Sequence, residues 1–339
     1  MATATDNTPQ LQDDDVAAID RLRDCFGQLR AELAKVIVGQ DEVIERLAIC
    51  LFARGHALLM GVPGLAKTLL ISQLADTLKL SFSRIQFTPD LMPMDITGTD
   101  ILQEGQGGKR EFEFIKGPVF SNVILADEIN RAPSKTQAAM LEAMQEQRVT
   151  VVGRPYELDK PFFVLATQNP VEQEGTYPLP EAQLDRFMFL IEVDYPKRDE
   201  EIQIAKTTTG GEMPSLDQIL EAQQVLDFQA LVRRVPVPSH IYEFAVDLVR
   251  RTRPNTDEAP DWIKPLVSWG AGPRAVQYLI LGGKARAALT GSYMVRLEDI
   301  MAVAEPVLGH RVLTTFGAES EGIKSTDIVK RLVDELNAE

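Results

Sequence analysis

The chain has 339 residues, and its composition of 45% hydrophobic and 25% charged residues is that of an ordinary globular protein long enough for two domains. Its net charge of −15 opposes binding to the phosphate backbone of nucleic acid, although it does not exclude a local basic channel. No apolar run approaches the ~20 residues that a membrane span requires, and the N-terminus lacks the apolar segment of a secretory signal, so we expect a cytoplasmic protein.

The first elements expected along the chain are helical. Residues 1–15 are polar and acidic and predict a disordered leader. Residues 16–34 carry one apolar stripe at helical spacing, and Val38-Gly39-Gln40 interrupts the pattern before a second helix around residues 43–51. The two cysteines and three histidines lack ligand spacing, so we interpret all of them as structural.

Short apolar runs bounded by turn signals follow, and they predict strands. The runs cover residues 57–60, 83–87, 122–126, 162–166 and 187–193, of which 83–87 is the weakest. Because helical stretches separate them, they predict an α/β fold with a parallel five-stranded sheet covered on both faces. Ligands bind such sheets at the carboxyl ends of the strands. In this chain those ends carry the loop at Gly61, two acids after residue 126, and Asn169.

Two predicted hairpins interrupt the alternation of strands and helices, and a mainly helical region follows it. Glycine-containing stretches near residues 99–115 and 148–158 predict hairpin insertions. After Pro196 helical patterns dominate, at residues 200–208, 216–232, 239–253, 274–289, 297–308 and 325–336. We therefore predict an α/β core over residues 16–195 and a small all-helical domain over residues 196–339.

The segment between the first strand and the next helix reads as a phosphate-binding loop. It runs Gly61-Val62-Pro63-Gly64-Leu65-Ala66-Lys67-Thr68. We expect Leu69, the following residue, to contact the nucleotide as well. Backbone N–H groups and the positive end of the helix dipole converge at such a turn. Lys67 is expected to reach the β- and γ-phosphates of ATP, and the Thr68 hydroxyl to bind Mg²⁺. The chain is therefore expected to be an ATPase.

Ala66 departs from the usual pattern, which has glycine at this position. Because alanine avoids positive φ, we expect its backbone to be nearly helical. The alternative is a turn that only resembles the motif.

A second group of candidates follows two later strands. Asp127 and Glu128 end an apolar strand, which suits Mg²⁺ binding by Asp127 and activation of the attacking water by Glu128 as general base. Taken alone, this pair is equally consistent with a helix cap. Asn169 ends the next strand, where its amide can help to orient the water; a turn residue before Pro170 is the simpler interpretation.

Two arginines have the chemistry to stabilise charge on a transferring phosphoryl group. Arg186 precedes the last strand, and Arg274 opens a helix after Gly272-Pro273. From the residues alone, each is equally consistent with a solvated surface charge.

Several long strings closely resemble the MoxR family of AAA+ ATPases, over nearly the whole chain from Val36 to Leu336. They occupy residues 86–91, 95–98, 125–133, 135–137, 141–146, 166–170 and 172–187. The family form of the phosphate loop also has alanine at the position of Ala66, so the resemblance makes this residue a family trait.

The resemblance implies further roles for candidate residues. Val38-Gly39-Gln40 would pack on the adenine, Asn169 would be sensor 1, and Arg274 would be sensor 2, in contact with the nucleotide. Arg186 would be the finger that enters the ATP site of a neighbouring subunit. The helical domain would be a lid, and both hairpins would face a central pore.

The resemblance also implies an assembly and a function. A finger in trans requires a homo-oligomeric ring, usually a hexamer, with ATP and Mg²⁺ at each subunit interface. Hydrolysis would change the angle between core and lid and remodel, mature or activate a client protein complex, possibly with a von Willebrand factor A domain partner. The alternatives are a nucleic-acid or metal-chelatase motor subunit, of which the net charge makes the nucleic-acid form unlikely, and an ATP-gated assembly scaffold with little turnover.

Overall fold

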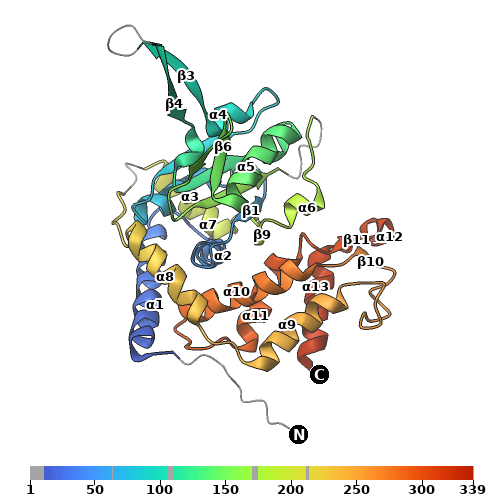
Figure 1. Cartoon of the computed structure of the whole chain (residues 1–339). Coiled ribbons are helices and arrows are strands. Elements are labelled where there is room, and N and C mark those ends of the chain that lie inside the picture. Colours follow the sequence, from blue (N-terminus) through green and yellow to red (C-terminus); the bar gives the residue numbers. More distant parts are fainter. Residues whose placement is uncertain (1–10, 63, 105–109, 170–174, 211–213, 339) are drawn as a thin grey trace.

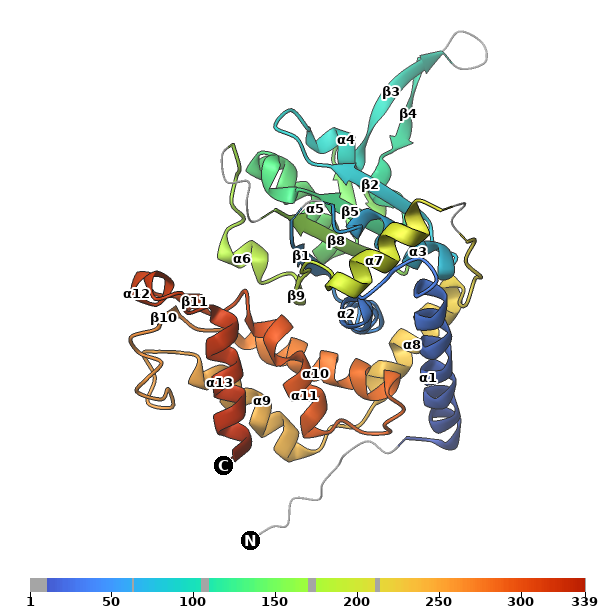
Figure 2. The same cartoon turned by 180° about the vertical axis from the view of Figure 1, so that it is seen from behind.

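The computed structural model describes residues 11–62, 64–104, 110–169, 175–210 and 214–338 (Figures 1 and 2). Residues 1–10 of the expected leader lie outside these ranges. Helix α1 (Asp13–Leu33) begins three residues before Val16, so residues 13–15 are helical and not part of a leader. Asp13, Asp14 and Asp15 occupy its first turn, where negative charge is favourable, and Asp15 forms an ion pair with Arg234 at 2.7 Å.

A parallel five-stranded sheet forms the centre of the N-terminal part, which confirms the predicted α/β fold. Its strands are β1 (Ala57–Met60), β2 (Phe82–Gln86), β5 (Val123–Asp127), β8 (Phe163–Gln168) and β9 (Phe189–Glu192), in the order β2-β5-β8-β1-β9. The register pairs Met60 with both Gln168 and Glu192. Three strands therefore end at the same level, and the residues that follow them meet at one edge.

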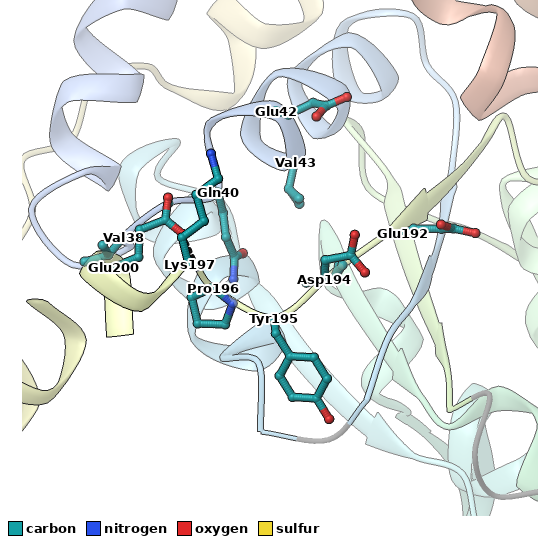
Figure 3. A pocket seen from close by; sticks show the side chains of 12 residues that line it. Val38, Gln40, Glu42, Val43, Glu192, Asp194, Tyr195, Pro196, Lys197 and Glu200 are labelled. Atoms are coloured by element: carbon teal, nitrogen blue, oxygen red, sulfur yellow. Dashed lines mark hydrogen bonds between the residues drawn. The ribbon is translucent and has the colours of Figure 1, made fainter. Parts of the chain in front are cut away.

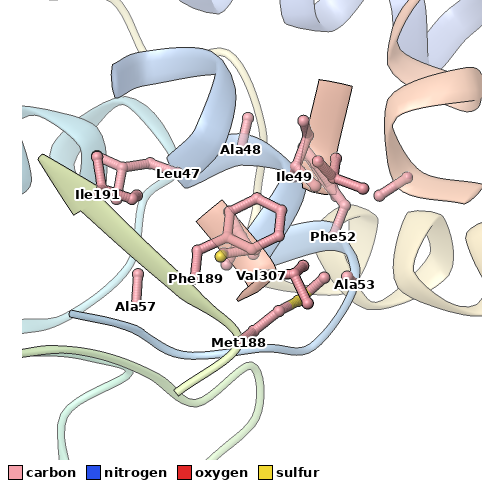
Figure 4. Packing of buried hydrophobic residues seen from close by; sticks show 14 of the residues in the cluster. Leu47, Ala48, Ile49, Phe52, Ala53, Ala57, Met188, Phe189, Ile191 and Val307 are labelled. Carbon is pink, nitrogen blue, oxygen red and sulfur yellow. The ribbon is translucent and has the colours of Figure 1, made fainter. Parts of the chain in front are cut away.

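Buried side chains alternate between the two faces of the sheet. On one face, β1 and β5 pack against α5 (Ser134–Glu146) through a smaller apolar cluster. The other face is covered by α2 (Asp41–Phe52) and α3 (Lys67–Thr77), and α1 packs against these helices in a larger cluster that continues into the C-terminal helices. Figure 4 shows Val307 from the C-terminal region beside Phe52 and Phe189 of the α/β core. One continuous core thus joins the two parts of the chain.

Both predicted hairpins form. Strands β3 (Gly98–Glu104) and β4 (Arg110–Lys116) pair antiparallel and follow the short helix α4 (Pro93–Thr97). This arm projects from the core on the side away from the C-terminal helices (Figure 1). Strands β6 (Arg148–Val151) and β7 (Arg154–Glu157) make the second hairpin.

The C-terminal region is helical, as expected. It contains α7 (Arg198–Thr208), α8 (Ala222–Arg234), α9 (Ser239–Arg251), α10 (Pro273–Leu289), α11 (Leu297–Leu308), α12 (Phe316–Ser320) and α13 (Ser325–Ala338), with a small sheet of β10 (Val267–Trp269) and β11 (Leu313–Thr314). Within the described ranges, no helix has the length and apolarity to cross a membrane.

One helix in this region begins later than the sequence pattern predicts. Residues 216–221 are not helical, and α8 begins at Ala222. The N–H of Ile219 donates to the Thr77 carbonyl at 2.7 Å, and that of Asp217 to the Glu32 carboxylate at 3.1 Å. The N–H of Leu220 donates to the same Thr77 carbonyl at 3.4 Å. These tertiary hydrogen bonds hold residues 217–220 outside the helix.

Candidate functional site

The phosphate loop lies between the end of β1 and the start of α3. A Cβ on Gly61 would lie 2.6 Å from the Val193 carbonyl oxygen, so only glycine fits beside the end of β9. Gly64 has a positive φ of 86°, and Leu65 is buried. Lys67 Nζ donates to the Gly61 carbonyl at 2.6 Å, which holds the lysine across the loop. Pro63 lies outside the described residues.

The expectation for Ala66 is wrong. Its backbone is left-handed, with φ 55° and ψ 22°, and not nearly helical. Its carbonyl still accepts the first helical hydrogen bond, from Leu70 N–H at 2.9 Å. A left-handed alanine costs about 1–2 kcal/mol. The chain accepts this conformation because two left-handed residues, Gly64 and Ala66, are needed to turn it from β1 into the axis of α3.

The segment expected to meet adenine borders a cavity of about 270 Å³ beside this loop. Val38, Gly39, Gln40 and Val43 line one side, and residues 192–197 line the other (Figure 3). Gln40 Nε2 donates to the Leu65 carbonyl at 3.2 Å, which ties the cavity to the phosphate loop. Gln40 Oε1 is buried and meets no donor among the described residues.

Asp127 and Glu128 are held by residues from both neighbouring strands. The Thr167 hydroxyl donates to Asp127 Oδ1 at 2.6 Å and accepts from Glu128 N–H at 2.8 Å. Arg84 Nη2 contacts Asp127 Oδ2 at 2.6 Å. Glu128 has a left-handed backbone, with φ 56°, which sets its direction at the end of β5. The Asp127 carboxylate and the backbone of Glu128 are therefore fixed in place.

The Glu128 carboxylate has two further contacts, both to Oε2. Gln86 Nε2 donates to it at 2.9 Å, and Arg131 Nη1 contacts it at 3.1 Å. Sequence reasoning assigned no role to Arg84, Gln86, Arg131 or Thr167. The available signal was the i, i+2 spacing of Arg84 and Gln86, which places both on one face of β2.

Several predicted residues converge on the carboxyl edge of the sheet. Partial burial lowers the pKa of Lys67, and the nearby Asp127 and Glu128 act in the opposite direction. Asn169 is buried and directly follows Gln168, whose carbonyl accepts from Gly61 N–H at 3.4 Å. Thr68 and Leu69 occupy the first turn of α3, both half-buried. The loop, both acids and Asn169 thus form one group.

Arg186 and Arg274 do not lie at the carboxyl edge of the sheet with the other predicted residues. Arg186 precedes β9, whereas the phosphate loop follows β1, and these strands run parallel with Ala57 beside Phe189. The two sites are therefore on opposite edges of the sheet, separated by at least the ~13 Å length of a four-residue strand. Arg274 contacts Asp185 at 3.2 Å, and both arginines line a hollow of about 430 Å³ at this amino edge.

Arg274 does not lie at the phosphate loop of its own chain, so the nucleotide contact that the resemblance implies for it stays a prediction, for the site of a neighbouring copy. The physical reason is the packing of α10 against α2 and the Asp185 ion pair, which bring the start of α10 to the amino edge. Tyr278, one turn later, donates its hydroxyl to the Arg186 carbonyl at 3.1 Å and keeps both arginines together.

Comparison with known families supports the class that this architecture indicates. Residues 56–189 match the ATPase family associated with various cellular activities (AAA), and residues 261–332 match the AAA lid domain. With the parallel sheet and the loop before α3, these matches identify an ATP hydrolase of the AAA+ class.

Individual relatives narrow this class. The chain is 42% identical to Chaperone MoxR1 of Mycobacterium tuberculosis, over 89% of this chain and 79% of that protein. It is 33% identical to Protein MoxR of Methylorubrum extorquens, over 86% and 88%. A crystal structure from Cytophaga hutchinsonii superposes with a TM-score of 0.87 at 42% identity, over 94% and 96%. The chain belongs to the MoxR family of AAA+ ATPases.

Proposed function

We propose that this chain hydrolyses ATP at sites shared between neighbouring copies in a ring, and that hydrolysis drives remodelling of a client protein complex. The observation that carries the proposal is the position of Arg186 and Arg274 on the edge opposite the phosphate loop. One chain carries both halves of a phosphate site but cannot bring them together. A head-to-tail contact between copies unites them, and such contacts close into rings.

The loop half of the site fits ATP and Mg²⁺. Backbone N–H groups of the loop, the α3 N-terminus and Lys67 supply the positive field for phosphates. Thr68 and Asp127 would hold Mg²⁺, which when bound neutralises charge on the β- and γ-phosphates. Arg84 occupies one oxygen of Asp127, and the remaining lone pairs of the carboxylate suit a metal-bound water.

Glu128 is the proposed general base, with Asn169 beside it to orient the attacking water. Gln86 and Arg131 hold Oε2 of the Glu128 carboxylate, and Oε1 is the oxygen that we propose to accept the proton from the water. Val38, Gly39 and Gln40 would hold the adenine in the adjoining cavity. Arg186 and Arg274 of the neighbouring copy would then stabilise charge on the γ-phosphate.

The client role is supported by two observations. A relative that is 42% identical is named a chaperone. The β3–β4 arm carries exposed apolar side chains, Leu102 and Phe112, of which Phe112 is 72% exposed. Such residues suit contact with another protein. We propose that the ring is a hexamer. We further propose that a partner with a von Willebrand factor A domain presents the client.

Mixing two inactive variants tests the shared site. Arg186→Ala retains Glu128, and Glu128→Gln retains Arg186, so a mixed ring contains interfaces with both groups. With random mixing at equal amounts and head-to-tail contacts, about one quarter of the interfaces are complete, and turnover should return to about a quarter of the wild-type value. Turnover that stays at the level of the pure variants at every ratio would rule out a site completed in trans.

A second experiment addresses the client. The Glu128→Gln variant, incubated with ATP, should retain bound partners that the wild type releases. The matched control is Lys67→Ala, which should bind neither ATP nor partners. Stimulation of turnover by DNA or RNA, with none by protein extracts, would contradict the client role and favour a nucleic-acid motor.

A further inference from the structure

The hollow that holds Arg186 and Arg274 contains a third arginine. Arg54 lines it as well, together with His56, Tyr278 and residues 144–147 at the end of α5. Its position follows from strand pairing: Arg54 lies just before β1 and Arg186 just before β9, and Met188 N–H donates to the His56 carbonyl at 2.7 Å. Three guanidinium groups from three separate segments thus border one cavity.

Hydrogen bonds connect the segments that line this hollow. His56 bonds to the Met144 carbonyl at 3.2 Å, which attaches the end of α5 to the start of β1. The Tyr278 hydroxyl bonds to the Arg186 carbonyl. The segments that carry the three arginines are therefore held in place before any ligand arrives.

The backbone of Arg54 is unusual for an arginine. Helix α2 ends in a Schellman motif: Gly55 N–H donates to the Cys50 carbonyl at 2.8 Å and Arg54 N–H to the Leu51 carbonyl at 3.2 Å. Arg54 occupies the left-handed position of this motif, with φ 59°, where glycine is the usual residue. An arginine there is less favourable than glycine by about 1 kcal/mol. Its presence at a disfavoured position indicates a use for the side chain.

The electrostatics point to an anionic ligand. Within the part of the chain that the structure describes, neither Arg54 nor Arg186 has an ion pair or a side-chain hydrogen bond through its guanidinium, and only Arg274 is paired, with Asp185. Glu146 is the acid that lines the hollow, and it contacts Arg148 at 3.5 Å. Partial burial lowers the pKa of Arg54, and the charge of Arg233 adds to this effect. In a chain of net charge −15, this is a local excess of positive charge.

We propose that Arg54 is a third phosphate-binding residue, which contacts the triphosphate of the neighbouring copy together with Arg186 and Arg274. This inference rests on the proposed shared site and extends it. A triphosphate carries its charge on several oxygens along its length, so three guanidinium groups around one hollow match it better than two. Arg54 then contributes both to holding the nucleotide and to stabilising charge on the γ-phosphate during hydrolysis.

The test compares Arg54→Ala and Arg54→Lys with Arg233→Ala, which removes a neighbouring charge that does not line the hollow. Turnover should fall about tenfold in Arg54→Ala, less in Arg54→Lys, and should be unchanged in Arg233→Ala. Mixing Arg54→Ala with Glu128→Gln should raise turnover above the average of the two pure variants. A readout without hydrolysis is the dissociation rate of a fluorescent ATP analogue from Glu128→Gln assemblies, which should increase about tenfold when Arg54→Ala is added.

The outcomes separate this inference from the shared site itself. If the Arg186→Ala mixture recovers activity but Arg54→Ala matches wild type in turnover and analogue release, the role of Arg54 is overturned and the shared site stands. If Arg54→Ala lowers turnover only because the assembly dissociates, as sedimentation would show, the proposed phosphate contact is also overturned. If the mixture of Arg186→Ala with Glu128→Gln shows no recovery of turnover, the shared site is overturned, and with it the role of Arg54 that rests on it.

Discussion

The guanidinium of Arg311 binds both the side chain and the main chain of Asp185. Its Nε donates to Asp185 Oδ1 at 2.8 Å, and its Nη2 donates to the Asp185 carbonyl at 2.8 Å. The same group donates to the carbonyls of Phe187 and Met188, at 2.7 and 3.2 Å, and to that of Val307. Arg311 follows α11, so one buried side chain joins the helical region to the segment that carries Arg186.

Loss of this contact should destabilise the fold. Arg311→Met retains much of the volume but removes the donor from Asp185 Oδ1 and from the carbonyls of Asp185, Met188 and Val307. Removing one partner of a buried ion pair costs about 3–5 kcal/mol, so the free energy of unfolding should fall by that order. Urea denaturation measures it. Arg198→Met, at an arginine that is 85% exposed and whose ion-pair partner Asp199 is 95% exposed, is the control and should change stability by under about 1 kcal/mol.

Glu128→Gln should bind ATP and lose turnover. The amide keeps the shape of the side chain but cannot accept a proton, and loss of a general base lowers rates by about 10²–10⁴-fold. Steady-state phosphate release measures turnover, and equilibrium binding of a fluorescent ATP analogue measures affinity. Turnover equal to that of wild type would show that another group acts as base.

Thr167→Val should lower turnover through both carboxylates. Valine matches the shape of threonine but lacks the hydroxyl that bridges Asp127 and the Glu128 N–H. We expect a loss of about 1–3 kcal/mol in stability, because two buried groups lose a partner. Turnover should also fall. Thr167→Ser retains the hydroxyl and should keep most activity; equal effects of both substitutions would assign the role to packing.

Acid should destabilise the fold through His56. Its Nδ1 accepts from Val164 N–H at 3.0 Å, so the neutral ring carries its proton on Nε2, facing the Met144 carbonyl. Burial lowers the pKa of His56 from 6.5 to about 4. Between these values the unfolded chain binds the proton and the folded chain does not, so stability is full above pH 6.5 and falls toward pH 4.

The slope for one such group is about 1.4 kcal/mol per pH unit. Urea denaturation between pH 7 and 4.5 should show a shallower dependence for His56→Gln than for wild type. Burial also lowers the pKa of His310, so part of the slope should remain. An unchanged slope in His56→Gln would mean that His56 is not the group responsible.

Phe112→Ser tests the projecting arm. Phe112 is exposed on β4 and belongs to neither buried cluster, so stability and basal turnover should match wild type. Capture of partners by the Glu128→Gln form should fall when Phe112→Ser is added. Undiminished capture would indicate that clients bind another surface.

Much of the architecture was predictable because it depends on local pattern. The five apolar runs predicted all five strands within two residues at each end, and β1 matches residues 57–60. Helix α11 likewise matches residues 297–308. The start of α8 was not predictable, because hydrogen bonds from residues 217, 219 and 220 to Glu32 and Thr77 hold the preceding segment against distant parts of the chain.

Which residue types are available for ATP chemistry, and that the strand ends bring the loop, both acids and Asn169 together, could be predicted from the sequence. That follows from the parallel order of short strands, after which the glycine loop and the polar residues come directly. Long-range packing sets the left-handed backbone of Ala66, the contacts of Gln86 and Arg131 to Glu128, and the edge of the sheet at which Arg54, Arg186 and Arg274 lie. These features depend on strand order and on the packing of α10 against α2, and such long-range contacts leave no periodic signal along the chain.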